Sequence, residues 1–144
     1  MTRRRWLPTM VRAQQAREDS AARRLAQARM DAAQAVEAAA AETARLTGMS
    51  APGTGSRGAF LNQAATRDAA AATHAAAVHR VRFTHQRVGV GLSELSSAAQ
   101  ARRTVERLSE RIAAETYAAE LSNQQRELDD VTITRFGRTS GGQA

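Results

Sequence analysis

The chain has 144 residues, no cysteine and a formal net charge of +7, and all 21 of its basic residues are arginine. Without cysteine it can form neither disulfides nor thiolate metal sites. Hydrophobic residues make up 42% of the chain but aromatic residues only 3%, and most of the apolar residues are alanine, so elongated helical packing is expected in place of a globular core.

Residues 7–47 are predicted to form one long coiled-coil helix, preceded by a flexible basic segment over residues 1–6. Apolar residues recur at alternating intervals of four and three over about six heptads, which is the pattern of a coiled-coil seam. Pro8 fits in the first turn, where its missing N–H is not needed. The predicted seam positions are Leu7, Val11, Gln14, Glu18, Ala21, Leu25, Ala28, Ala32, Ala35, Ala39, Glu42, Leu46 and Met49.

A loop over residues 48–58, GMSAPGTGSRG, follows the first helix, because its Gly, Pro and Ser residues favour turns. Residues 59–136 are predicted to form the second helix, with a kink or local fraying at residues 89–91 (GVG), since glycine weakens a helix interior. Gly137 is expected to end this helix, and residues 137–144 are expected to be disordered. The predicted inward positions of the second helix are Phe60, Ala64, Ala71, Val78 and Val88.

Two long helices joined by one loop predict an all-α fold, a two-helix antiparallel coiled-coil hairpin within a single domain. The second helix is the longer one and should overhang the first by some 50 Å at about 1.5 Å per residue. If the helices pair outward from the loop, Leu7 lies opposite residues near Gln100 and the segment 105–131 projects beyond the first helix.

The projecting segment carries two apolar stripes that are displaced by about two positions, so one partner helix cannot easily cover both. Val105, Leu108 and Ile112 mark the first stripe. The second stripe consists of Tyr117, Leu121, Leu128 and Val131. We therefore expect this segment to bind another protein.

The sequence does not indicate an enzyme. His74, His79 and His85 lack the i, i+4 spacing of a helical metal site, and no phosphate loop, nucleophile elbow or Ser/His/Asp set is recognisable. No catalytic residue, cofactor, metal or small-molecule substrate is therefore expected. No segment approaches the roughly 18 apolar residues of a membrane span, and there is no secretory hydrophobic region, so a soluble protein is expected.

The absence of lysine is open to two interpretations. Arginine suits bidentate contacts to phosphate or carboxylate, but a GC-rich genome also favours arginine and alanine codons. The charge of +7 leaves an Arg-rich helical nucleic-acid-binding protein as one alternative. A coiled coil that associates only with itself is another.

Near its N-terminus the chain has Leu7 and the triplet MVR at residues 10–12, and toward its C-terminus it has ERLSER at 106–111 and QRELDDV at 125–131. These segments resemble the opening and the two closing elements of the FliJ family, a small coiled-coil component of the flagellar type III export ATPase complex. Arg5 departs from the aromatic residue usual at that place. The alanine-rich middle third shares only helical character with the family.

This resemblance implies a central stalk or coupling factor inside the hexameric flagellar export ATPase, which also contacts the export gate membrane protein and escorts other export chaperones. The expected location is cytoplasmic, peripherally at the inner face of the cell membrane at the flagellar base. No nucleic acid is expected as a partner on this interpretation. A stalk-like component of a non-flagellar type III secretion system is the remaining alternative. The candidate contacts with the ATPase ring are Leu7, Val11, Arg12, Leu108, Arg111, Ile112, Tyr117, Leu121, Gln125, Leu128, Asp129 and Val131.

Overall fold

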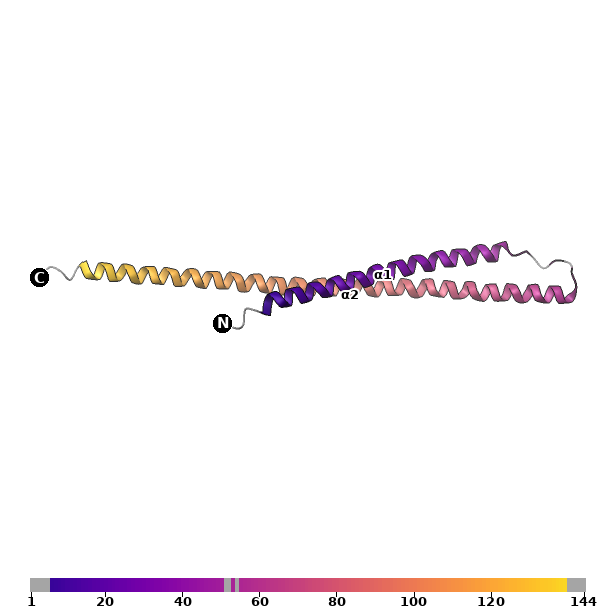
Figure 1. Ribbon diagram of the computed structural model, residues 1–144, viewed down its shortest axis with the longest axis horizontal. Helices are drawn as coiled ribbons and strands as arrows, with labels where there is room; N and C mark the ends of the chain where they lie inside the picture. The colour runs from indigo at the N-terminus through magenta and orange to yellow at the C-terminus, as the bar shows by residue number, and fades with distance from the viewer. Residues whose placement is uncertain (1–5, 51–52, 54, 140–144) are drawn as a thin grey trace. The chain divides into compact units, whose positions relative to one another are not determined.

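The computed structural model describes residues 6–50, 53 and 55–139, with only the backbone for residues 133–139. Two helices make up this part of the chain: α1, Trp6–Gly48, with 43 residues, and α2, Arg57–Thr139, with 83 residues (Figure 1). They pack against each other, and no strand occurs among the described residues. The predicted all-α helical hairpin with a longer second helix is confirmed.

The helix ends differ by a few residues from the prediction. α1 begins at Trp6 instead of Leu7 and ends at Gly48. α2 continues through Gly137 to Thr139, so the expected stop at Gly137 is wrong. The flexible basic segment was predicted for residues 1–6, of which 1–5 lie outside the described residues. Of the predicted tail, residues 140–144 lie outside them too.

The chain forms two compact units, which are named here by their residues. The hairpin unit comprises residues 14–100, and the terminal unit comprises residues 1–13 together with 101–144. Each unit contains part of α1 and part of α2. The prediction of a single domain stays a prediction.

Every predicted seam position of α1 is buried or half-buried, which confirms the heptad assignment. The most deeply buried of them include Ala21, Leu25 and Ala35, with 2%, 4% and 3% of their surface exposed. Because alanine has a small side chain, such a seam lets helices approach closely but removes little apolar area from water in each layer.

The inward face of α2 follows the same alternation of three and four, but two of its predicted positions are wrong. Phe60 is half exposed, and Ala71 is exposed while its neighbour Ala70 is buried. The seam therefore runs through Ala70, one residue earlier than expected. The buried or half-buried positions at heptad spacing are Gln63, Arg67, Ala70, His74, Ala77, Val81, Thr84, Val88, Gly91, Leu95, Ala98, Arg102, Val105, Ser109, Ile112 and Thr116.

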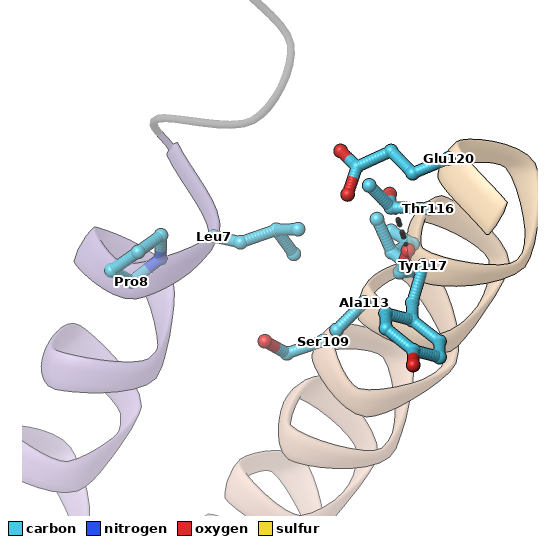
Figure 2. Close-up of a pocket in the computed structure, with 8 residues that line it drawn as sticks. Leu7, Pro8, Ser109, Ala113, Thr116, Tyr117 and Glu120 are labelled. Atoms are coloured by element: carbon cyan, nitrogen blue, oxygen red, sulfur yellow. Dashed lines mark hydrogen bonds between the residues drawn. The ribbon is translucent and has the colours of Figure 1, made fainter. Parts of the chain in front are cut away.

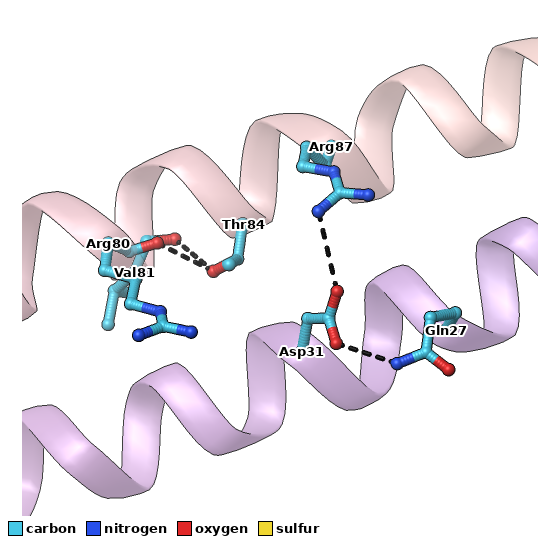
Figure 3. A network of polar contacts seen from close by, with 6 residues as sticks. All are labelled: Gln27, Asp31, Arg80, Val81, Thr84 and Arg87. Atoms are coloured by element: carbon cyan, nitrogen blue, oxygen red, sulfur yellow. Dashed lines mark hydrogen bonds and ion pairs between the residues drawn. The ribbon is translucent and has the colours of Figure 1, made fainter.

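Polar contacts between the two helices fix their antiparallel pairing in the hairpin unit. Arg24 Nε lies 3.3 Å from Glu94 Oε2, and Arg87 Nη1 lies 3.5 Å from Asp31 Oδ2 (Figure 3). Asp31 Oδ1 also accepts a hydrogen bond of 2.9 Å from Gln27 Nε2. Since successive partners move forward on α1 and backward on α2, these pairs define one antiparallel register.

Nearer the linker, the same register continues into the first turns of α2. Thr43 Oγ1 and His74 Nε2 lie 3.1 Å apart. The carbonyl oxygen of Ser50 accepts hydrogen bonds from Gln63 Nε2 at 3.3 Å and from Arg67 Nη1 at 3.4 Å. Ser50, which follows α1, therefore lies beside residues 63–67, about two to three turns into α2.

Local capping explains where α2 begins. The Ser56 hydroxyl accepts a hydrogen bond of 3.3 Å from the backbone N–H of Ala59, and the Ser56 carbonyl accepts one of 3.1 Å from Phe60 N–H. This is the geometry of an N-cap serine, which satisfies donors that the first turn of a helix leaves open.

The glycines of the GVG segment do not interrupt the helix. α2 is continuous across residues 89–91, and neither glycine has a positive φ.

Across the described helices, no segment combines the length and the apolar character needed to span a membrane.

Candidate protein-binding surface

In the terminal unit, Leu7 is buried against α2, with 5% of its surface exposed. Figure 2 shows its side chain pointing from α1 toward the face of α2 that carries Ala113 and Thr116. Together these residues line a groove of about 300 Å³. The full lining is Leu7, Pro8, Ser109, Ile112, Ala113, Thr116, Tyr117 and Glu120.

The position of Leu7 corrects the predicted pairing. Leu7 lies beside Ile112 and Thr116, whereas pairing outward from the loop places it near Gln100. Val105 and Ile112 of the first predicted stripe are accordingly half-buried. Val105 and Ile112 are therefore partly covered within the fold and do not project freely as predicted, whereas Leu108, the third member of the first stripe, is 43% exposed.

Beyond Thr116 the environment of α2 changes. All described side chains from Tyr117 to Thr132 are exposed. The large apolar side chains among them, Tyr117, Leu121, Leu128 and Val131, expose 68%, 46%, 67% and 54% of their surface. Such a run of large apolar side chains marks an interaction surface more often than isolated exposed ones do. We name it, with Gln124 at the intervening heptad position, the C-terminal stripe.

The C-terminal stripe lies on a different side of α2 from the seam. The seam ends at Thr116 and the stripe begins at the next residue, Tyr117, which points about 100° further around the helix. Each then follows its own alternation of four and three. A helix that covers the seam thus cannot also cover the C-terminal stripe. This change of helix face explains why the second stripe is displaced from the first in the sequence.

The segment that carries the C-terminal stripe is acidic, although the chain as a whole has a charge of +7. Residues 117–132 contain four carboxylates and one arginine, Arg126, and hence have a net charge of −3. Glu120 and Glu127 are seven residues apart and immediately precede Leu121 and Leu128. They therefore form an acidic border along one edge of the stripe.

The remaining candidate contacts do not share this surface. Leu108 is 43% exposed, but it is nine residues before Tyr117 and so faces the opposite side of α2 at about 100° per residue. Arg111 is exposed and pairs with Glu115, with Nε 2.9 Å from Oε1. Arg12, Gln125 and Asp129 are exposed, and Val11 is half-buried.

The sequence reasoning missed Glu120, Gln124 and Glu127 as parts of the surface. Their signal was available: each falls on a fixed position of the heptad that the apolar residues define. The stripe was identified from its apolar members alone, so its polar position and its acidic border were overlooked.

No cluster that could hold a metal ion is found among the residues that the structure describes. His74 contacts Thr43 Oγ1 as a seam residue.

Comparison with known protein families gives a match. The sequence matches the family described as flagellar FliJ protein over residues 4–141. Comparisons with curated proteins and with solved structures found no match. Since the family match covers nearly the whole chain, the chain belongs to the FliJ family of flagellar proteins.

Proposed function

We propose that this chain is a non-enzymatic stalk and coupling factor of the flagellar export ATPase ring, and that the C-terminal stripe is its principal contact with the ring. The observation that carries the proposal is the run of exposed apolar side chains from Tyr117 to Val131. It begins where the intramolecular seam ends, so the fold leaves it available for another protein.

Family membership supplies the biological setting. The FliJ family has a flagellar export-related role, and it is a family of non-catalytic, chaperone-like proteins. The stalk role, the ATPase partner and the escort of export chaperones are parts of the proposal.

Burial of the C-terminal stripe would contribute apolar area to a contact with another protein. Burying a leucine side chain that is otherwise exposed contributes about 1.5–3 kcal/mol, and Leu121 and Leu128 are 46% and 67% exposed. Aromatic residues such as Tyr117 are enriched in interfaces. A ring of subunits offers several surfaces around one helix, and such a partner can contact the stripe without displacing α1 from the seam.

The proposal extends to location. The protein would act in the cytoplasm at the inner face of the membrane, where it would also contact the export gate. A face other than the C-terminal stripe is available for this second contact, since Leu108 and Arg111 lie elsewhere on α2. Neither nucleic acid nor a small molecule is part of the proposed function.

The test uses the purified full chain and the purified export ATPase from the same organism. The double variant Leu121→Ala/Leu128→Ala removes the centre of the stripe, and Leu61→Ala, at a 56% exposed leucine of the hairpin unit, serves as the matched control. We expect binding to the ATPase, measured by fluorescence anisotropy, to fall at least tenfold for the double variant and to stay unchanged for the control.

Two results would contradict the proposal. If the wild-type chain failed to bind the ATPase, the partner would be wrong. If the double variant bound as well as the wild type, the ATPase could still be a partner but the C-terminal stripe would not be the contact. Circular dichroism of each variant would show that the helices remain folded.

A further inference from the structure

The residues of the C-terminal stripe and those beside it can be assigned to the positions of a coiled-coil heptad. Tyr117, Gln124 and Val131 take the d position, and Leu121 and Leu128 take the a position, because three residues separate a from d and four separate d from the next a. Glu120 and Glu127 then both occupy g, the position that flanks the seam of a coiled coil. The opposite flank, the e position, is neutral. It consists of Ala118, Gln125 and Thr132.

The hairpin unit of the same chain shows how g positions are used in this fold. With Leu25 and Val88 at a positions, Arg24 and Asp31 of α1 fall at g. Glu94 and Arg87 of α2 are at g as well. These residues form the two ion pairs between the helices, Arg24 with Glu94 at 3.3 Å and Asp31 with Arg87 at 3.5 Å. Opposite charges thus meet across g positions of antiparallel helices, as expected from the pairing rules of coiled coils.

We infer that the C-terminal stripe pairs with an antiparallel helix of a partner protein that carries arginine or lysine at the two positions facing Glu120 and Glu127. This inference rests on the proposed function and specifies the kind of surface that the partner presents. The apolar a and d residues supply most of the buried area. The acidic g positions select the partner and its orientation.

A second copy of this chain does not meet the requirement. Antiparallel pairing of two C-terminal stripes would place glutamates at g against glutamates at g, which is unfavourable. Parallel pairing would place Glu120 and Glu127 opposite Gln125 and Thr132 and form no ion pair. In both arrangements two segments of net charge −3 would approach each other. The charges beside the C-terminal stripe therefore favour a basic partner over a second copy of this chain.

Gln124 adds a further specification. It is the only polar side chain among the a and d positions from Tyr117 to Val131. A polar residue at one seam position fixes register, because any other alignment would bury its amide against apolar side chains. The partner helix therefore presents a polar residue opposite Gln124, between its two basic positions.

Synthetic helical peptides can test the charge requirement without knowledge of the partner. One peptide has leucine at a and d, a single asparagine at the a position that faces Gln124 in an antiparallel pair, and arginine at g. A matched peptide differs only in having glutamate at g. Each is titrated into the full-length chain at about 0.1 M salt, where charges within about 10 Å still interact, and at about 1 M salt, where they are screened.

We expect the wild-type chain to bind the arginine peptide at least about fivefold more tightly than the glutamate peptide at the lower salt, because two pairs change from attraction to repulsion. High salt should reduce the preference. The variant Glu120→Arg/Glu127→Arg should reverse it. As a matched control, Asp129→Arg/Asp130→Arg should keep the wild-type direction of preference, since neither aspartate occupies an e or g position beside the C-terminal stripe.

Equal binding of both peptides, or no binding of the arginine peptide, would overturn the inference. So would sedimentation evidence that the wild type dimerises through the stripe in a way that Leu121→Ala/Leu128→Ala abolishes. The proposed function is tested separately by the ATPase. If the ATPase lost affinity for the leucine double variant but kept it for Glu120→Arg/Glu127→Arg, the stripe would be the contact and only the charge requirement would be wrong.

Discussion

Leu25 of α1 lies directly against Gly91 of α2. A Cβ atom at position 91 would come within 3.3 Å of Leu25 Cδ1 and 3.4 Å of Leu25 Cα, and Leu25 is only 4% exposed. The missing side chain of Gly91 thus permits the two helices to approach closely at this layer. Gly89, two residues away, has nothing within 4 Å of a Cβ placed there.

The two glycines should therefore respond differently to alanine. Gly89→Ala should raise the free energy of unfolding by up to about 1 kcal/mol, because alanine is the better helix former and the added methyl meets open space. Gly91→Ala should give a smaller gain or a loss, since its methyl must displace Leu25 and part of the α1 backbone. Thermal unfolding followed by circular dichroism measures both. Equal gains would show that the close approach at Leu25 has no energetic consequence.

Leu25 should be among the most costly residues to truncate in the hairpin unit. Its neighbours in the seam include Ala21 and Ala28, which are too small to fill the space that its loss would create. We expect Leu25→Ala to lower the free energy of unfolding by about 2–5 kcal/mol. Met30→Ala, at a 59% exposed site on the same helix, should change it by less than about 0.5 kcal/mol. Similar effects in urea titrations of the two variants would refute the assigned seam.

The Asp31 and Arg87 side chains should couple across the hairpin. Asp31→Arg and Arg87→Asp each place like charges opposite each other and should destabilise the protein, whereas the double exchange should recover much of the loss. Because both side chains are partly exposed, we expect a coupling of about 0.2–1 kcal/mol that declines with salt. A double-mutant cycle measures it. Strictly additive effects would mean that this pair does not help to set the register.

Leu7 and the C-terminal stripe should differ in their effect on folding. Leu7→Ala removes a buried side chain and should increase amide hydrogen exchange of α2 around residues 109–116, where the Leu7 contact lies. Leu121→Ala/Leu128→Ala removes exposed side chains and should leave that exchange unchanged. If the stripe double variant loosened residues 109–116 as much as Leu7→Ala, the stripe would have a structural role within the terminal unit.

Local chemistry made much of α1 predictable. Its heptad of Leu7, Leu25 and a series of alanines keeps one register along the helix, with Gln14, Glu18 and Glu42 as polar members, so the inward face could be predicted for the whole helix. The start of α2 was less exact because the Ser56 cap lies inside a loop rich in turn-forming residues. The error at Phe60 arose because a large apolar residue was assumed to face inward, whereas it is 50% exposed, only three residues after the start of α2.

The candidate surface was only partly predictable. The apolar residues Tyr117, Leu121 and Leu128 were recognised from their spacing, but the sequence could not show which stripe α1 would cover. That choice depends on where Leu7 lies along α2. Once Leu7 is placed beside Ile112, Val105 and Ile112 of the first stripe belong to the fold, whereas Leu108 and the second stripe are exposed.

The sequence by itself determined that the chain forms two long helices, which residues of α1 face inward, and which family it belongs to. These properties depend on local propensity and on a repeating pattern. Only the tertiary structure decided the register, because a seam composed mainly of alanine repeats every seven residues and can be shifted along its partner with little change in buried area. Contacts that occur once, such as Leu25 with Gly91, Asp31 with Arg87 and Ser50 with Gln63 and Arg67, distinguish one alignment from the others.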